Sequence, residues 1–192
     1  MNNPLIIVIC LFVIIILFSP IPWSLINKLI KKITASFRRR TLDEEKISVI
    51  QDISIAVEAL AEFGKGATII IDQKKEVYNY IVDSEQLDAQ ISSNLITTIF
   101  EGSKTPLHDG AIVIRGSRIE QASAYITKLS KQKLPKKFGT RHRSGLGISE
   151  ATSAIVIVLS EERQKVTIFY KGDWEELAPK DLFDRLVRTW IN

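Results

Sequence analysis

Two short polar segments of the chain carry residue types that could bind a phosphorylated ligand. Residues 108–111 read HDGA, and residues 139–143 read GTRHR. The first segment offers a carboxylate and an imidazole beside a glycine, and the second offers two guanidinium groups, an imidazole and a hydroxyl. The chain has only two histidines, His108 and His142, and one lies in each segment. This distribution favours a single site formed by both segments.

Asp109 is the first candidate for chemistry. A carboxylate can hold Mg²⁺ or Mn²⁺ against phosphate oxygens, because hard cations prefer oxygen ligands. His108 could add a nitrogen ligand, more readily for Mn²⁺ than for Mg²⁺. Gly110 and Ala111 have little or no side chain, so a phosphate or a sugar can approach the backbone there. The simpler alternative is an ordinary turn, since Asp-Gly is a common turn dipeptide.

The second segment is a candidate phosphate-binding site. Arg141 and Arg143 each offer a planar guanidinium fork that matches phosphate geometry, and Thr140 can donate its hydroxyl. In an extended strand the two arginines would point to opposite faces, whereas in a loop they could converge. The alternative is a solvated basic loop continuous with the lysines of residues 128–137, and composition alone slightly favours it.

A third polar group follows an apolar run. Ser160, Glu161 and Glu162 close residues 154–160, which predict a buried strand. Carboxylates at the carboxyl end of such a strand fall where ligands bind in α/β proteins. From these residues alone, a charged turn is the stronger interpretation.

Apolar periodicity predicts the elements that must position these residues. Thr41 and Glu44 resemble a capping box, and apolar residues at helical spacing lead from there to Gly64, which suits a C-terminal cap. Six or seven strands interleaved with helices indicate an α/β or α+β domain. Further helices are expected over 87–100, 143–152 and 179–190, and strands over 67–71, 76–82, 110–115, 118–127, 154–160 and 165–170.

Residues 1–23 predict a single transmembrane anchor. Residues 5–18 are an unbroken apolar run, and their neighbours extend it to about the 20 residues that a spanning helix needs. A cleaved signal peptide is the alternative, but no basic residue precedes the run. A buried core helix is disfavoured because the run has no polar face. The only cysteine, Cys10, lies here, so no intramolecular disulfide is possible.

Residues 24–40 predict a basic linker beside the membrane. Residues 28–40 hold six Lys or Arg and no acid, so the remainder has a net charge of −2 although the whole chain carries +4. Positive charge on this side of the anchor predicts a single-pass protein of the cell membrane with its main domain in the cytoplasm. The linker is expected to be a helix on an anionic membrane surface or a solvated helix. An RNA-binding arm is a weaker reading, and no nucleic-acid partner is expected.

The two polar segments and their flanks resemble the DGA and RHR motifs of the diadenylate cyclase domain. The similarity extends in register from about residue 64 to residue 172, and includes LDAQIS at 87–92, GISE at 147–150 and VLSEE at 158–162. Two motifs with matching flanks at the family spacing are far more specific than an Asp-Gly pair alone.

The resemblance implies an α/β fold in which a mixed central β-sheet has helices on both sides, within a catalytic domain over residues 41–192. It also implies condensation of two ATP molecules into cyclic di-AMP with release of two pyrophosphates. Two domains would meet face to face in a homodimer, with Mn²⁺ or Mg²⁺ as the cofactor.

The same resemblance implies roles for individual residues. Asp109 would bind the metal and help activate the ribose 3′-hydroxyl, with His108 and Glu162 as further metal ligands. Arg141 and His142 would act on the reacting phosphate together with Asp109. The implied substrate-binding residues are Gly110 and Ala111 for ribose and phosphate, Tyr125 and Ile126 for adenine, Thr140, Arg141, His142 and Arg143 for the phosphates, and Ser160, Glu161 and Glu162 for the triphosphate.

Two features depart from the family pattern, and other hypotheses stay open. The common membrane-bound cyclase has three predicted spans where this chain predicts one, and Ser144-Gly145 stands where the family often has Ala-Ala. The second hypothesis is a catalytically silent, membrane-anchored sensor of ATP or a cyclic dinucleotide. The third is a basic peripheral protein that binds anionic lipid or RNA. The absence of Walker A, GxGxxG, HExxH and GxSxG motifs disfavours several other enzyme classes.

Overall fold

The computed structural model of the chain describes residues 7–12, 23–102 and 106–191. The chain divides into two compact units, Met1–Leu42 and Asp43–Asn192. Most of the predicted anchor, residues 1–6 and 13–22, lies outside the described residues, so the anchor stays a prediction. Within the described ranges, no helix combines the length and the apolar character that a membrane crossing requires.

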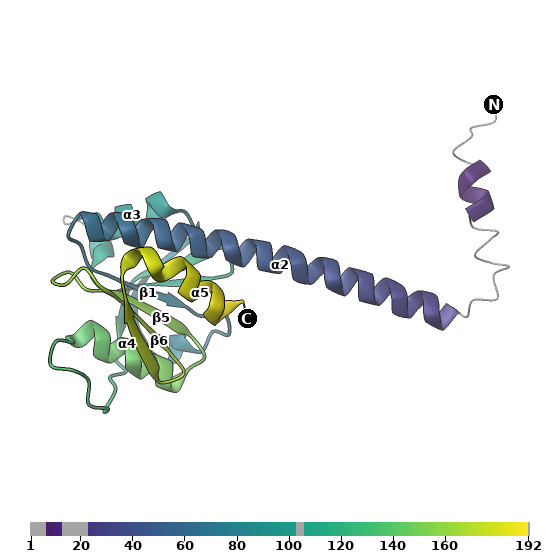
Figure 1. The fold of residues 1–192 in the computed structure, drawn as a ribbon. Helices are drawn as coiled ribbons and strands as arrows, with labels where there is room; N and C mark the ends of the chain where they lie inside the picture. Colours follow the sequence, from purple (N-terminus) through teal and green to yellow (C-terminus); the bar gives the residue numbers. More distant parts are fainter. Residues whose placement is uncertain (1–6, 13–22, 103–105, 192) are drawn as a thin grey trace. The chain divides into compact units, whose positions relative to one another are not determined.

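The second unit is built on a mixed, seven-stranded sheet (Figure 1) with the order β2-β4-β3-β1-β5-β6-β7. β1 and β3 are parallel, and every other neighbouring pair is antiparallel. The strands are β1 (Ala67–Ile71), β2 (Ile81–Gln90), β3 (Ala111–Arg115), β4 (Arg118–Ile126), β5 (Ile155–Leu159), β6 (Val166–Tyr170) and β7 (Asp173–Leu177).

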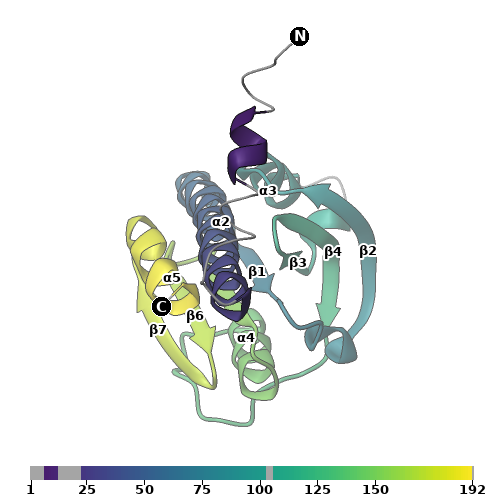
Figure 2. The same ribbon diagram turned by 90° about the vertical axis from the view of Figure 1, so that its right-hand side faces the viewer.

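Helices cover both faces of this sheet, which confirms the predicted fold class (Figures 1 and 2). One core lies between the sheet and the helices α2 (Trp23–Glu62), which contributes buried residues from Val49 to Leu60, α3 (Ser93–Glu101) and α5 (Leu182–Trp190). The other lies between the sheet and α4 (Thr140–Ala151). β1 and β5 are buried along their whole length, as expected for continuous apolar strands under two layers of helix.

Helix boundaries differ most from those that the sequence predicts. α2 is continuous through Thr41, whose hydroxyl donates to the carbonyl of Arg38 rather than capping a new helix. The predicted helix over 87–100 begins only at Ser93, because the Ser92 side chain accepts the N–H of Leu95 and caps it there. α4 begins at Thr140 instead of residue 143. The arginine motif therefore lies on a helix and not in a loop.

The edges of the sheet also differ from the prediction. The predicted strand over 76–82 is a short 3₁₀ helix at Val77–Tyr80, followed by β2. β7 was not predicted, because its sequence, DWEEL, is too polar to show a clear alternation. Further 3₁₀ turns lie at Pro106–His108 and Pro179–Asp181.

Gly147 allows α4 to approach the preceding loop closely, and its replacement should destabilise the domain. A Cβ at Gly147 would lie 2.7 Å from the carbonyl oxygen of Lys128 and 2.8 Å from the nitrogen of Ser130. We expect Gly147→Ala to lower the free energy of unfolding by about 1–3 kcal/mol, measured by urea denaturation. Gly139→Ala is the matched control, because its Cβ would meet nothing within 4 Å. An equal loss in both variants would contradict this packing argument.

Candidate functional site

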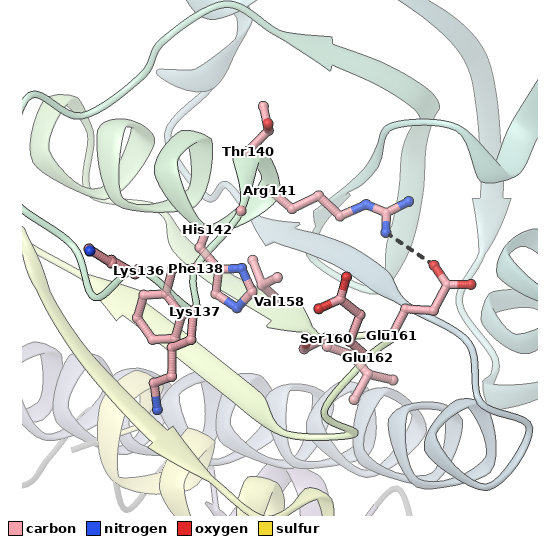
Figure 3. Close-up of a pocket in the computed structure, with 12 residues that line it drawn as sticks. Lys136, Lys137, Phe138, Thr140, Arg141, His142, Val158, Ser160, Glu161 and Glu162 are labelled. Carbon is pink, nitrogen blue, oxygen red and sulfur yellow. Dashed lines mark ion pairs between the residues drawn. The ribbon is translucent and has the colours of Figure 1, made fainter.

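Two neighbouring cavities at the ends of the central strands are lined by most of the polar residues that the sequence singles out. The first has a volume of about 570 Å³ and is shown in Figure 3. The second has a volume of about 740 Å³. Thr140 and Arg141 line both cavities. The predicted residues His142, Ser160, Glu161 and Glu162 line the first cavity, and Asp109, Gly110, Ala111, Tyr125 and Ile126 line the second.

The backbone around Gly110 fixes the position of Asp109. Gly110 has a φ of +121°, a conformation that other residues rarely adopt, and a Cβ there would lie 2.7 Å from the carbonyl carbon of Ser123. Ser123 itself has a φ of +53° and sits where the β3–β4 register shifts between Ala111 and Val113. The Ser123 hydroxyl donates to the carbonyl oxygen of Asp109 at 2.8 Å. This bulge leaves the Asp109 side chain exposed at the cavity.

Arg141 lies in the first turn of α4 and points across the first cavity toward Glu161 (Figure 3). Its Nη1 is 3.7 Å from the Glu161 carboxylate. Gly66 leaves room for this pair, because a Cβ on Gly66 would lie 3.0 Å from Nη1. Both side chains are substantially exposed, at 43% and 57%, so the pair contributes little stability. A phosphate could therefore replace Glu161 as the partner of Arg141 at small cost.

The amino end of α4 adds to the affinity for anions. Gly139 is the N-cap residue and makes no side-chain hydrogen bond to the first turn. Backbone N–H groups at a helix start carry partial positive charge and bind phosphate readily. The helix start, Thr140 and Arg141 thus form one anion-binding wall.

His142 is buried and held in a stack of rings. Its imidazole lies parallel to Phe138 with ring centroids 4.4 Å apart, and the guanidinium of Arg163 is 3.4 Å from its Nε2. Burial lowers the pKa of His142 from 6.5 to about 4, and the positive charge of Arg163 contributes to this shift. His142 is consequently neutral at pH 7 and can offer a phosphate a hydrogen bond but not a charge.

Arg163 is itself fixed by the end of the sheet. It forms an ion pair with Glu176 of β7, and Glu176 also accepts a hydrogen bond from Lys137 at 2.7 Å. Burial on its own would raise the pKa of Glu176, but the hydrogen bonds and charges of Lys137 and Arg163 together outweigh it and lower that pKa. The charged side chains beside His142 are therefore held in place by their interactions with Glu176.

Two predicted residues lie outside both cavities. Neither His108 nor Arg143 lines them. The Arg143 carbonyl accepts the N–H of Ser130 at 3.0 Å, so its backbone anchors the loop that precedes α4. Because α4 starts at Thr140, Arg143 is on a helix two positions after Arg141. The loop in which the two arginines could have converged is therefore absent, and helical residues two apart do not face each other.

The cavities also contain residues that the sequence analysis missed. Thr68 of β1, Asp83 of β2 and Ser144 of α4 line the second cavity, and Phe138 lines the first. Thr68 lies inside an apolar strand, and Asp83 lies between the strand predicted over 76–82 and the helix predicted over 87–100, so neither showed a motif. Ser144 was visible in the sequence only as a departure from the family pattern.

A divalent metal would depend on few protein ligands. Within the described residues, no group of three His, Cys, Asp or Glu side chains gathers at one point. The expected trio of Asp109, His108 and Glu162 is therefore not assembled within one chain, and Asp109 and Glu162 line different cavities. Mg²⁺ commonly binds to one or two carboxylates plus substrate phosphates and water. The exposed carboxylate of Asp109 beside an anion-binding wall fits that pattern.

The fold and the paired cavities define an α/β domain with an anion-binding site that suits a nucleotide. Residues 54–174 match the model of the DAC family, described as DisA bacterial checkpoint controller nucleotide-binding. The match covers more than half of the chain, and the chain belongs to this family.

Several known proteins are similar to the chain. A diadenylate cyclase of Listeria monocytogenes is 34% identical over 151 residues, which cover 78% of this chain and 55% of that protein. The chain thus spans about half the length of this relative. The crystal structure of a double mutant of DacA from Staphylococcus aureus has a TM-score of 0.69 and 32% identity, covering 78% of this chain and 99% of that one. The structure of a protein described as a hypothetical membrane spanning protein from Bacillus cereus has a TM-score of 0.62 and 28% identity, with 67% and 62% covered.

Because His142 is buried in its neutral form, the free energy of unfolding should fall as the pH is lowered from 6.5 toward 4. Its pKa is 6.5 in the unfolded chain and about 4 in the folded one, so the unfolded state binds more protons between these values. The associated stability is complete above pH 6.5 and declines as the pH falls toward 4. We expect the wild-type protein to lose about 1–3 kcal/mol more than His142→Gln over this range, measured by denaturant unfolding. Parallel pH profiles would contradict the burial of a neutral ring.

Proposed function

We propose that the chain is a diadenylate cyclase that condenses two ATP molecules into cyclic di-AMP and two pyrophosphates. One observation carries this proposal: Thr140 and Arg141 form a wall shared by the Asp109 cavity and the cavity of Glu161 and Glu162. A nucleotide whose phosphates bind this wall can place its ribose near Asp109. The similarity to the Listeria and Staphylococcus proteins supports the same activity.

The reaction consists of two identical substitutions. In each, the 3′-oxygen of one ATP forms a bond to the α-phosphorus of the other, and the bond from that phosphorus to the bridging oxygen breaks. Pyrophosphate leaves with the bonding electrons, and the proton of the 3′-hydroxyl is transferred to a base or water. Such a transfer depends mainly on alignment and charge neutralisation, which fits a site rich in anion donors.

Each group in the site has a role in this chemistry. Asp109 accepts a hydrogen bond or the proton from the 3′-hydroxyl, and its carboxylate would hold a divalent metal. Arg141 and the start of α4 stabilise charge on the phosphates, while the neutral His142 contributes orientation. Tyr125, exposed over 64% of its surface, offers a ring on which adenine can stack, and the Ile126 backbone offers polar contacts. A divalent cation, when bound, neutralises phosphate charge.

The catalytic unit is proposed to be a symmetric dimer. One domain holds one ATP, so a second domain must bring the other ATP to it, and a two-fold axis lets each 3′-oxygen face the opposite α-phosphorus. The rim of the second cavity supports this arrangement, because Val82, Tyr125 and Leu129 are exposed by 67%, 64% and 48%. Apolar side chains that surround a polar cavity are suited to being covered by a partner.

We also propose that residues 1–23 anchor the enzyme in the cell membrane, with the basic residues 24–40 and the catalytic domain on the cytoplasmic side. The apolar run and the charge that follows it support this. The similar Bacillus cereus protein, which is described as membrane spanning, is consistent with it.

Replacement of Asp109 should abolish synthesis while sparing the fold. We expect the full-length chain in detergent, given ATP with Mn²⁺ or Mg²⁺, to form cyclic di-AMP detectable by mass spectrometry. Asp109→Asn should lower the rate by about 10²–10⁴-fold, because the amide cannot take a proton. Asp83→Asn is the matched control: its carboxylate lines the same cavity and should change the rate by less than about tenfold.

The outcomes of this assay separate the hypotheses. Equal rates for the wild-type protein and Asp109→Asn would refute the role of Asp109. A wild-type protein that binds ATP but makes no product, with either metal, would favour the catalytically silent sensor.

The dimer proposal makes a separate prediction. The rate per chain should rise with protein concentration until dimers are saturated, because a monomer cannot complete the reaction. Varying the concentration of the full-length protein at saturating ATP, with light scattering to follow mass, tests this. A constant rate per chain in a sample that remains monomeric would rule out the face-to-face dimer.

A further inference from the structure

The second cavity contains a buried hydroxyl with an unused hydrogen bond. Thr68 is only 3% exposed, and its Oγ1 has no hydrogen-bond partner among the described residues. Leaving a buried hydroxyl without a hydrogen bond is unfavourable, so most such groups in native proteins have a partner. Thr68 is an exception that lies in the wall of a cavity shared with Asp109 and Arg141.

The neighbouring hydroxyl shows why Thr68 differs. Ser144 lines the same cavity from α4, but its hydroxyl donates to the carbonyl oxygen of Arg141 at 3.0 Å. The Ser144 proton is thus already used within the first turn of the helix. Thr68 faces the α4 side of the sheet, like Ile70 two residues later. Rotation about χ1 moves the hydroxyl between staggered positions, so it can turn toward a ligand in the cavity that Thr68 lines.

The position of Thr68 indicates what kind of ligand atom would meet it. Asp109 is the group proposed for the ribose 3′-hydroxyl, and Arg141 is the group proposed for the phosphates. Thr68 lines the cavity that both of them share, where the phosphate nearest to the ribose would lie. A phosphate oxygen accepts hydrogen bonds strongly because it is charged.

We propose that the Thr68 hydroxyl is a further substrate-binding group, which donates a hydrogen bond to an oxygen of the α-phosphate. This inference rests on the proposed function, since it assumes that a nucleotide occupies the cavity. Among the described residues the hydroxyl has no hydrogen-bond partner, and the bound nucleotide supplies one. Thr68 therefore contributes to affinity without contributing to the stability of the free domain.

The sheet provides a matched control for this idea. Thr68 pairs with Val158 of β5, and Val158 pairs with Thr167 of β6, so the two threonines lie in one row. The Thr167 hydroxyl is likewise buried and without a partner among the described residues. Thr167 lines neither cavity. The two residues share type, strand environment and missing hydrogen bond, and differ in access to the ligand.

The test measures binding without turnover. Titration calorimetry of the full-length protein in detergent would use 3′-deoxy-ATP with Mg²⁺, because this nucleotide keeps the α-phosphate but lacks the attacking hydroxyl. We expect Thr68→Val to weaken binding roughly tenfold, as loss of one hydrogen bond to a charged group predicts. Thr68→Ser should bind within about threefold of wild type, and Thr167→Val should bind like wild type. Thermal unfolding without ligand should show Thr68→Val to be as stable as wild type or more stable.

The remaining outcomes overturn the inference in distinguishable ways. Wild-type affinity in Thr68→Val would mean that water satisfies the hydroxyl and the nucleotide does not. Equal weakening by Thr68→Val and Thr167→Val would show a general effect of sheet packing. If the wild-type protein makes cyclic di-AMP, either result overturns this inference alone. If it neither binds 3′-deoxy-ATP nor forms product, the proposed function fails as well.

Discussion

The site depends on the directions in which four neighbouring strands run. β1 and β3 are parallel, so both begin at the same end of the sheet. β5 is antiparallel to β1 and β4 is antiparallel to β3, so these two strands finish at that end. Ala67 consequently pairs with Leu159, which places Gly66 beside Glu161. Asp109 precedes β3 and Tyr125 lies near the end of β4, at the same end of the sheet. Residues from four distant segments therefore meet because the hydrophobic core fixes the order and direction of these strands.

The two arginines near the first cavity, Arg141 and Arg163, differ in how readily they could bind a ligand phosphate. Arg141 is paired with Glu161 on an exposed surface, where the pair costs little to break. Arg163 is paired with Glu176 and is less exposed, so it stays behind His142, whose pKa is lowered mainly by burial and further by the charge of Arg163. Arg141 is thus available to bind an incoming phosphate, whereas Arg163 remains paired with Glu176. A protonated His142 would add charge, but burial makes that state unfavourable.

The sequence predicts the central strands well and the edges poorly, for a physical reason. The predicted ranges of β1, β3 and β5 agree with the structure to within about one residue, since strands buried on both faces must be continuously apolar. β7 and the start of β2 escape prediction because edge strands satisfy only half of their hydrogen bonds in the sheet and tolerate polar residues. The predicted start of α4 is too late because its first turn, TRHR, is rich in polar residues and shows no apolar face. Asp109 and Arg141 are candidates from residue type together with the resemblance of their segments to a known family, whereas Thr68 needs the fold, since a threonine among isoleucines shows no pattern.

The openness of the Asp109 cavity is what makes one chain insufficient for the proposed chemistry. A phosphoryl transfer is favoured when water is excluded and the reacting atoms are aligned, but Asp109 and Tyr125 are exposed in the single domain. Closing such a site with a lid would require a mobile segment that also binds the second nucleotide. In the proposed dimer a second copy of the domain would perform both tasks, because it would cover the apolar rim formed by Val82, Tyr125 and Leu129 and carry its own ATP. In the proposed mechanism dimerisation would therefore complete the site, and control over the pairing of the domains would control synthesis.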